Sequence, residues 1–527
     1  MRKRTIKIGA RNTDPSAASL LYFEEPLLEF GFGQKLVYPR DGLFLFGPVG
    51  DTKQVSALRY GVIGTCDGVR RFHQWASVVG DFIDVPRRRV GSKAIEPHHV
   101  PFPGFREAFR AEWSEPSSVI ADLDGREIER ALRIANRHEA IRTAVDIFVN
   151  RLIGEHNRLE NPPALWFVVI PEIVYRLGRP QSTVPKQDRI PGSVRISESR
   201  ARQLGTEPTL FGVEEQEAEV YQYATHFRRQ LKARLLKDRI VTQIVRETTL
   251  APEEFKHDNG SLVRRVEDPA TIAWKLCTAT YYKAGGRPWQ LADVRPGVCY
   301  VGLGYKRSEL AKDIRSACCA AQMFLTDGDG VVFRGAIGPW FQRDSRQFHL
   351  SRVAARNLIE MVAREYERVH DGPPHELFLH GRSAFSDEEW AGFRDSCPST
   401  TNLVGVQIAD ARDDLKLFRM GDYPVVRGTA LPLGERGAYL FSTGYTPRLD
   451  TYMGPDTPNP VIVRVSRGDC SLNTVLADVL ALTKVNFNSC LHNDRMPVTI
   501  QFANAVGDVL ISAPVDSEPR LPFKFYI

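Results

Sequence analysis

Two adjoining stretches decide the fold of this chain: Thr271–Trp289, TIAWKLCTATYYKAGGRPW, and Gly297–Arg307, GVCYVGLGYKR. The first predicts a helix that stops at a Gly-Gly turn, and Pro288 prevents the helix from continuing. The second is rich in Val, Leu and Tyr and predicts a strand about ten residues after the helix ends. We therefore place a boundary between two α/β units at this point.

Composition limits the classes of protein to consider. With 527 residues and 43% hydrophobic content, the chain can form two to four domains with substantial cores. The net charge is only +6, from 70 basic and 64 acidic residues. A nucleic-acid site would therefore have to be a local basic patch, because the protein as a whole is not a polycation.

The cysteines and the termini favour a cytoplasmic protein. The 8 cysteines are scattered without a C-x-x-C pair, so neither a zinc site nor a disulfide framework is expected. Residues 1–9 are basic, but no apolar segment follows them, and no run approaches 18 apolar residues. We expect a chain that is neither exported nor inserted in a membrane.

The first half of the chain alternates strands and helices. Residues 20–48 read as an extended lead-in, and 57–64 and 164–171 as buried strands. Apolar residues at helical spacing predict one long helix over about 128–156, and a polar helix is expected over about 214–237. This alternation predicts a mainly parallel sheet with helices on both faces.

The second half begins with strands. Those expected are 297–307, 322–335, 375–382, 401–408, 425–445 and 460–465, with helices over about 351–370 and 472–485. Strands first, then strands alternating with helices, indicate a second α/β layer.

A basic constellation precedes the Gly-Gly turn. Arg228 and Lys232 share one face of a predicted helix, Gln243 lies in the following strand, and Lys275 and Lys283 are eight residues apart on the next helix. Several converging donors are what a phosphate group requires, because an isolated surface lysine contributes little. On spacing alone, a solvated basic helix face remains the alternative.

The order and spacing of several motifs resemble a short prokaryotic Argonaute that consists of MID and PIWI domains. The motifs are EEPLLEFGFG, LKARLLKDRIVTQIVRETTL, YYKAGGRPW, LALTKVNFN and MPVTIQFANAVGDVL, and the resemblance covers residues 20–527. It implies an α/β fold in which a Rossmann-like MID domain is followed by an RNase H-like PIWI domain. The implied divisions are an extended lead-in at 1–40, the MID domain at 41–290 and the PIWI domain at 291–527.

The resemblance also implies a binding site for the 5′ phosphate of a guide strand. Lys232, Gln243 and Lys283 match the positions that hold this phosphate, and Arg228 stands where the family often has Tyr or His. Lys275 is expected to add a second charge to the same pocket.

The last residues of the chain are implied to complete this pocket. Many prokaryotic members use a C-terminal carboxylate, through a bound divalent cation such as Mg²⁺, at the guide phosphate. The chain ends LPFKFYI, so the Ile527 carboxylate is the candidate metal ligand. The alternative is that this segment is simply a last core strand.

The catalytic acids of the family are missing at the matching positions. Gly304 and Gly381-Arg382 replace the first two, and Asn504, expected in a strand-to-helix turn, replaces the last. These residues offer no carboxylates for a pair of hard cations, so we expect no cleavage. Asp327, Asp329 and Asp387 are nearby acids that do not match the motif.

The implied function is therefore recognition without cleavage. A guide RNA would direct binding to complementary single-stranded invader DNA, from a plasmid or phage. An APAZ-containing partner, with a sirtuin-like or TIR domain that consumes NAD, would then be activated in a heterodimer or a larger assembly. Two alternatives remain: a guide-directed nuclease, and a stand-alone nucleic-acid-binding scaffold. The effector type and the preferred 5′ nucleotide stay open.

Overall fold

The computed structural model covers most of the chain. It describes residues 19–50, 55–85, 99–113, 119–204, 213–293, 295–307, 317–324, 330–338, 341–342, 347–411, 415–452, 454, 456–514 and 521–527. Residues 1–18 of the expected lead-in, together with Asp327 and Asp329, lie outside this part.

A four-stranded parallel sheet forms the first α/β unit, in the order β7-β5-β8-β9. Its strands are β5 (Tyr60–Thr65), β7 (Ile120–Leu123), β8 (Leu165–Ile170) and β9 (Thr242–Arg246). Every residue of β8 is buried, as expected of a central strand covered on both faces. The strands expected at 57–64 and 164–171 are thus present.

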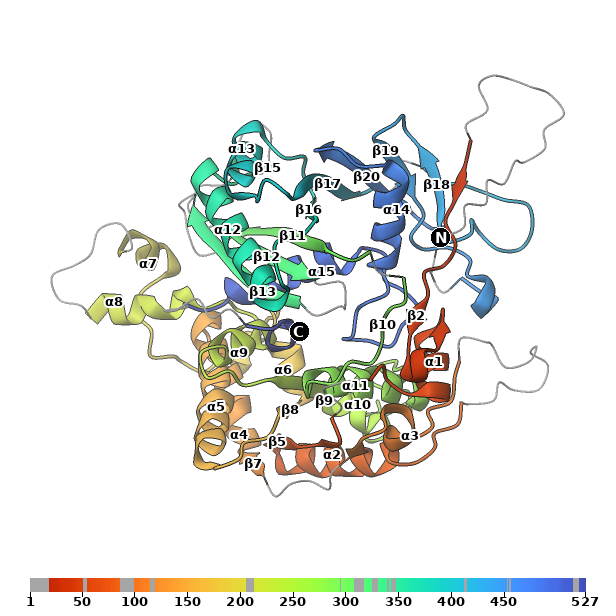
Figure 1. Ribbon diagram of the computed structural model, residues 1–527. Helices are drawn as coiled ribbons and strands as arrows, with labels where there is room; N and C mark the ends of the chain where they lie inside the picture. Colours follow the sequence, from red (N-terminus) through yellow and green to blue (C-terminus); the bar gives the residue numbers. More distant parts are fainter. Residues whose placement is uncertain are drawn as a thin grey trace.

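Helices cover both faces of this sheet (Figure 1). One face packs against α4 (Gly125–Leu132), α5 (Arg137–Arg158) and α9 (Phe227–Leu235), and the other against α2 (Cys66–Val79) and α11 (Pro269–Lys283). The helix α11 ends at Lys283, directly before the Gly-Gly turn, as the sequence predicts.

Two long helices expected from the sequence are interrupted. The helix predicted over 128–156 is two helices, because Asn136 caps α5 by accepting hydrogen bonds from the main chain of His138 and Glu139. The polar helix predicted over 214–237 was also wrong. That range contains α8 (Val213–Ala218), the 3-10 turn η3 (Glu219–Gln222) and the separate helix α9.

A nine-stranded sheet forms the second unit, in the order β1-β18-β19-β20-β17-β16-β11-β12-β13. Its main strands are β11 (Val298–Arg307), β12 (Ala317–Phe324), β13 (Gly330–Gly338), β16 (Glu376–Gly381), β17 (Asn402–Asp410) and β20 (Val461–Arg467). β11, β12 and β13 are antiparallel neighbours, whereas β16 and β17 run parallel to β11. Three antiparallel strands followed by two parallel ones fit the RNase H-like layer expected from the resemblance.

The two faces of β11 pack against different helices. Val301 and Leu303 lie in a cluster with α12 (Arg352–Val369) and α13 (Asp387–Ser396). The opposite face meets α15 (Val498–Leu510), and α14 (Leu472–Ala481) belongs to the same apolar cluster as α15. Because successive side chains of a strand point to opposite faces, neighbouring residues of β11 meet different helices.

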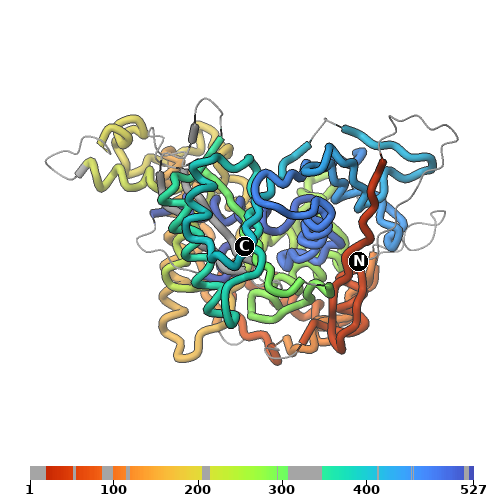
Figure 2. Tube along the Cα trace, turned by 45° about the horizontal axis from the view of Figure 1, so that its top comes forward, coloured from red at the N-terminus to blue at the C-terminus, as the bar shows by residue number. Residues whose placement is uncertain are grey.

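The lead-in joins both units. β1 (Leu21–Tyr22) pairs with β18 (Thr429–Pro432) at the edge of the second sheet (Figure 2). β2 (Leu28–Glu29) pairs with β3 (Lys35–Leu36) and with β10 (Gln290–Leu291), beside α1 (Pro39–Phe46). The domain limits at residues 40 and 290 stay predictions, since these short strands bridge them.

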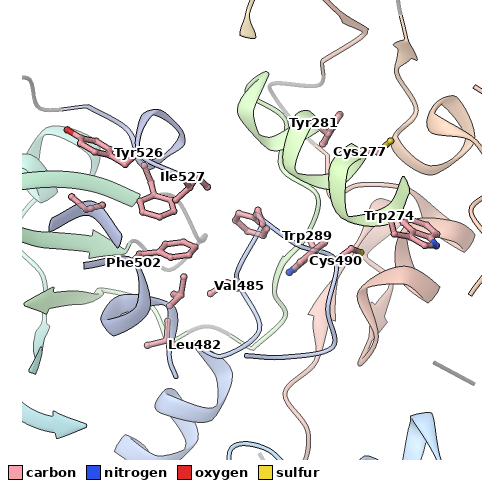
Figure 3. Packing of buried hydrophobic residues seen from close by; sticks show 14 of the residues in the cluster. Trp274, Cys277, Tyr281, Trp289, Leu482, Val485, Cys490, Phe502, Tyr526 and Ile527 are labelled. Carbon is pink, nitrogen blue, oxygen red and sulfur yellow. The ribbon is translucent and has the colours of Figure 1, made fainter. Parts of the chain in front are cut away.

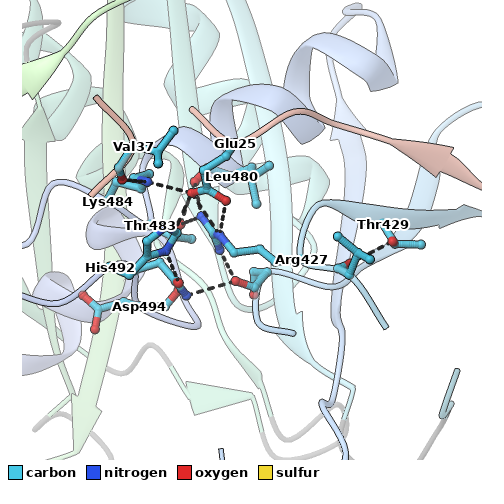
Figure 4. A network of polar contacts seen from close by, with 12 residues as sticks. Glu25, Val37, Arg427, Thr429, Leu480, Thr483, Lys484, His492 and Asp494 are labelled. Carbon is cyan, nitrogen blue, oxygen red and sulfur yellow. Dashed lines mark hydrogen bonds and ion pairs between the residues drawn. The ribbon is translucent and has the colours of Figure 1, made fainter. Parts of the chain in front are cut away.

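A buried charge network anchors the lead-in to the second unit (Figure 4). Glu25 accepts from Arg427 Nε at 2.8 Å and from Lys484 Nζ at 2.7 Å. Burial lowers the pKa of Lys484 to about 8, although Glu25 raises it in part. Lys484 also donates to the Val37 carbonyl at 2.6 Å, so one ammonium group ties two points of the lead-in to the end of α14.

Within the described residues, no helix is both long enough and apolar enough to cross a membrane.

Candidate nucleic-acid interface

Two lysines from different helices meet at the first residues of β9. Lys232 of α9 donates to the Thr242 carbonyl and hydroxyl oxygens, both at 3.3 Å. Lys283, the last residue of α11, donates to the same carbonyl at 3.1 Å and to Gln243 Oε1 at 2.6 Å. Lys232 and Lys283 are 3% and 1% exposed. We call Lys232, Thr242, Gln243 and Lys283 the lysine cluster.

The lysine cluster holds two buried ammonium groups, and neither has a described Asp or Glu partner. Burial, followed by the charges of Lys283 and Arg228, holds the pKa of Lys232 well below its usual range. Burial and Arg228 do the same to the pKa of Lys283. Among the described residues, no Asp or Glu side chain pairs with these lysines or with the exposed Arg228. Buried cations that repel one another are stabilised by an anion, so the cluster is suited to binding one.

Local sequence fixes the end of α11, and with it Lys283. Gly285 has a φ of +105°, which favours glycine, and it ends the helix two residues after Lys283. A side chain at Gly286 would place its Cβ 2.3 Å from the ring of Tyr281. The Gly-Gly pair is therefore required both for the turn and for close packing on the helix.

The tail of the chain reaches the lysine cluster. Lys232 Nζ donates to the main-chain oxygen of Ile527 at 2.5 Å. The preceding residues form a 3-10 turn, η7 (Phe523–Phe525), so the alternative of a last core strand is wrong. Phe523 stacks on Phe502 of α15 with ring centroids 3.7 Å apart. Ile527, Tyr526 and Phe502 lie in one apolar cluster that extends to Trp274 and Tyr281 of α11 (Figure 3).

Lys275 does not join the lysine cluster. Its Nζ pairs with both carboxylate oxygens of Glu267, at 2.6 and 2.7 Å. Eight residues of helix separate it from Lys283, a rise of about 12 Å. The structure thus brings together Lys232, Gln243 and Lys283 beside Arg228 and Ile527, and leaves Lys275 outside.

The positions at which the resemblance would place catalytic acids lie on β11, at the end of β16 and in α15. A Cβ at Gly304 would stand 2.7 Å from the main chain of Ala503 in α15, so the helix occupies the space that a side chain would need. Arg382 follows the end of β16 and its Nη2 lies 3.5 Å from Asp410. Gly381 precedes it against the ring of Phe385. No group of three His, Cys, Asp or Glu side chains among the described residues could hold a metal ion.

The expected position of Asn504 needs a correction. Asn504 does not lie in a strand-to-helix turn, because α15 runs unbroken from Val498 to Leu510. Its Nδ2 donates to the Ile500 carbonyl one helical turn earlier, at 2.9 Å. The strand-forming residues Val498, Thr499 and Ile500 follow Pro497, which starts the helix instead.

A stacked arrangement at the end of β9 was not expected from the sequence. Tyr175 of α6 (Glu172–Leu177) has the guanidinium carbons of Arg246 and Arg179 at 3.3 and 3.5 Å from its ring centroid. Arg246, the last residue of β9, is held by both carboxylate oxygens of Glu172, at 2.8 and 2.7 Å. The i, i+4 spacing of Tyr175 and Arg179 was the only sequence signal for it.

The arrangement of the two sheets is that of Argonaute proteins. Clostridium butyricum Argonaute bound to a guide DNA and a 19-mer target DNA matches with a TM-score of 0.60 and 14% identity, over 98% of this chain and 56% of that chain. A. aeolicus Argonaute matches with a TM-score of 0.53 and 13% identity, over 94% of this chain and 54% of that chain. An Aa-Ago structure with externally bound siRNA matches at 0.53 and 13%, over 97% and 56% of the two chains.

The chain therefore has an Argonaute-like fold, with a Rossmann-like MID unit followed by an RNase H-like PIWI unit. It spans about half the length of the Argonautes it matches. At this level of identity the likeness concerns the fold. No protein-family profile and no curated protein matches the sequence.

Proposed function

We propose that this protein binds a guide strand by its 5′ phosphate and uses the guide to recognise a complementary strand without cutting it. The observation that carries the proposal is the lysine cluster, in which two buried ammonium groups share one carbonyl and have no Asp or Glu partner among the described residues. A terminal phosphate supplies the missing negative charge and accepts several charge-assisted hydrogen bonds. Gln243 and the exposed Arg228 stand beside the lysines as further donors.

The finer description follows from the motif resemblance. The guide is an RNA and the target is single-stranded DNA from a plasmid or phage, recognised in the cytoplasm of a prokaryote as part of abortive-infection defence. The Argonaute-like fold supports guide-directed binding in general, and the Clostridium butyricum relative was solved with guide and target DNA.

The proposal includes a Mg²⁺ ion at the guide phosphate. Mg²⁺ commonly takes one or two protein oxygens together with phosphate oxygens and water. The main-chain oxygen of Ile527, which lies against Lys232, would be the protein ligand of this ion. The cation would neutralise part of the charge shared by phosphate and carboxylate, while Lys232 would stay close enough to bind the phosphate.

Steric packing supports recognition without cleavage. The first acid of an RNase H-like centre would have to stand at Gly304, where α15 leaves no room for a Cβ. We propose that enzymatic output comes from an APAZ-containing partner with a sirtuin-like or TIR domain, for which NAD is the substrate. The partner forms a heterodimer with this chain, and larger assemblies follow activation.

Binding and cleavage assays test this proposal directly. The purified chain should bind 5′-phosphorylated guide more tightly than 5′-hydroxyl guide of the same sequence, and should retain a complementary DNA strand intact in Mg²⁺ or Mn²⁺. With the co-purified partner, NAD consumption should rise only when guide and target are both present. Equal affinity for the two guides, or cutting of the target at a defined bond by this chain alone, contradicts the proposal.

A further inference from the structure

Next to the start of α9, the helix that carries Arg228 and Lys232, lies a flat cationic surface whose geometry is fixed in advance. The ring of Tyr175 has two faces, and each guanidinium carbon lies within 3.5 Å of its centroid. Two groups that close cannot share a face, so Arg246 covers one face and Arg179 the other. Arg246 is partly buried and held by Glu172, whereas Arg179 is exposed. The outer face of the Arg179 guanidinium is therefore the free end of the stack.

The main chain around Arg179 is also held in place. The amide of Arg179 donates to Ser182 Oγ at 3.3 Å, and the amide of Ser182 donates back to the Arg179 carbonyl at 3.0 Å. Ser182 Oγ itself donates to the carbonyl of Arg176 at 2.7 Å. Among the described residues, no carboxylate pairs with the Arg179 guanidinium. An arginine so oriented, and without an acidic partner, is available to a ligand.

This surface adjoins the start of α9. The amide of Phe227 donates to the Gly178 carbonyl at 2.9 Å, which places Arg179 and Arg228 on neighbouring segments. Burial, then the charges of Arg229, Arg228 and Arg179, lower the pKa of His226 to about 4. Arg179 thus contributes to the same positive field as Arg228, and Arg228 in turn acts on both lysines of the cluster.

We propose that the Arg179 guanidinium, supported by Tyr175, is the surface on which the terminal base of the guide stacks. The inference rests on the proposed function, because it concerns the nucleotide whose phosphate occupies the lysine cluster. Guanidinium planes and aromatic rings both stack on nucleobases, and stacking tolerates any base because each base has a π face. Arg228, which replaces the usual aromatic residue, then binds the phosphate, and the base stacks on Arg179, just after the end of α6.

The test combines variants of the stack with guides that lack the terminal base. Wild-type protein, Arg179→Ala and Tyr175→Ala are titrated with a 5′-phosphorylated guide and with the same guide carrying an abasic first nucleotide. Stacking of one base corresponds to roughly a 5- to 150-fold effect on the dissociation constant. Both variants should lose affinity in that range for the normal guide and change little for the abasic guide.

Matched controls separate stacking from charge and from folding. Tyr175→Phe keeps the ring and should behave like wild type. Arg176→Ala removes an exposed arginine from the same helix and should have no effect on either guide. If Arg179→Ala weakens the normal and abasic guides by the same factor, Arg179 binds phosphate and the inference is wrong. If it weakens neither, the base stacks elsewhere and the inference is also wrong.

Failure of the proposed function gives a different result. In that case wild-type protein does not distinguish 5′-phosphate from 5′-hydroxyl guide, whatever stands at position 179. If wild-type protein prefers the 5′-phosphorylated guide, but Arg179→Ala weakens binding of the normal and the abasic guide equally, only the stacking role of Arg179 is wrong.

Discussion

Lys232 and Lys283 come from helices α9 and α11, yet both donate to the carbonyl oxygen of Thr242, at 3.3 and 3.1 Å. One carbonyl cannot compensate two buried ammonium groups, and the lowered pKa values of both lysines express this conflict. An anion bound in the cluster stabilises the charged form of both lysines.

Replacing either lysine should weaken guide binding through the 5′ phosphate. Each of Lys232→Ala and Lys283→Ala removes a charge-assisted contact of roughly 1.5–3 kcal/mol. Fluorescence anisotropy should show at least a tenfold loss for 5′-phosphorylated guide and little change for 5′-hydroxyl guide. Lys275→Ala is the control, because Lys275 pairs with Glu267 outside the cluster. A loss of the same size in Lys275→Ala would show that only general basic charge matters.

Guide binding should take up protons at alkaline pH. The lysines have lowered pKa values in the free protein, and a bound phosphate dianion raises them, so the complex holds more protons than the free chain. Above pH 7, where the phosphate is already a dianion, affinity should fall as pH rises. Calorimetry in buffers of different ionisation enthalpy measures the uptake directly. Proton release above pH 7 would contradict the assignment of the lysines.

Residues appended after Ile527 should disturb the cluster. A Gly-Ser-Gly extension moves the terminal charge away from Lys232 and should weaken 5′-phosphorylated guide binding and reduce its dependence on Mg²⁺. Thermal unfolding should change little, because Phe523 and its stack on Phe502 remain. If affinity and Mg²⁺ dependence are both unchanged by the extension, the carboxylate plays no part in the site.

Introducing an acid at Gly304 should destabilise the protein and produce no cleavage. The Cβ would lie 2.7 Å from the main chain of Ala503, and overpacking of this kind costs about 1–3 kcal/mol. Gly304→Ala should show the same loss in denaturant unfolding, since the Cβ is the cause. Gly154→Ala is the control, because no atom lies within 4 Å of its Cβ. If Gly304→Asp has the same free energy of unfolding as wild type, α15 can shift to accommodate the side chain at little cost.

Glu25→Gln should destabilise the fold. Burial alone would raise the pKa of Glu25, but Arg427, Lys484 and His492 hold it well below its usual range. Removing its charge leaves buried cations unpaired, at a cost of about 3–5 kcal/mol. Because the folded-state pKa is lowered, wild type should lose this contribution as pH falls below the ordinary range of glutamate, and the variant should not. The exposed neighbour Glu24→Gln should match wild type in denaturant unfolding.

The fold was largely predictable because its signals are local. The all-apolar run of β8 and the Gly-Gly end of α11 each determine an element over a few residues. The interruption at Asn136 was missed because the apolar periodicity continues across it, while the cap depends on a single side chain. Asn504 was misplaced because helix α15 is built from strand-forming residues whose packing against β11 overrides propensity.

The site was predictable only in part, since it is assembled from distant segments. The positions of Lys232, Gln243 and Lys283 follow from motif spacing, and the structure does bring them together. Lys275 is predicted to lie on the same side of its helix as Lys283. Its ammonium group pairs instead with Glu267, which lies in the loop before that helix. The stack of Tyr175 between Arg179 and Arg246 joins residues from two elements, which pattern reading cannot place.

The contact between Lys232 and Ile527 joins residues 295 positions apart. During synthesis the parallel sheet, α9 and α11 can form long before the tail emerges, because domains fold from the N-terminus as they are made. The lysine cluster nevertheless gains its contact with Ile527 only after this distant segment has been made and the long loop has closed. This anion site is therefore assembled later than the sheet and the helices that carry its lysines.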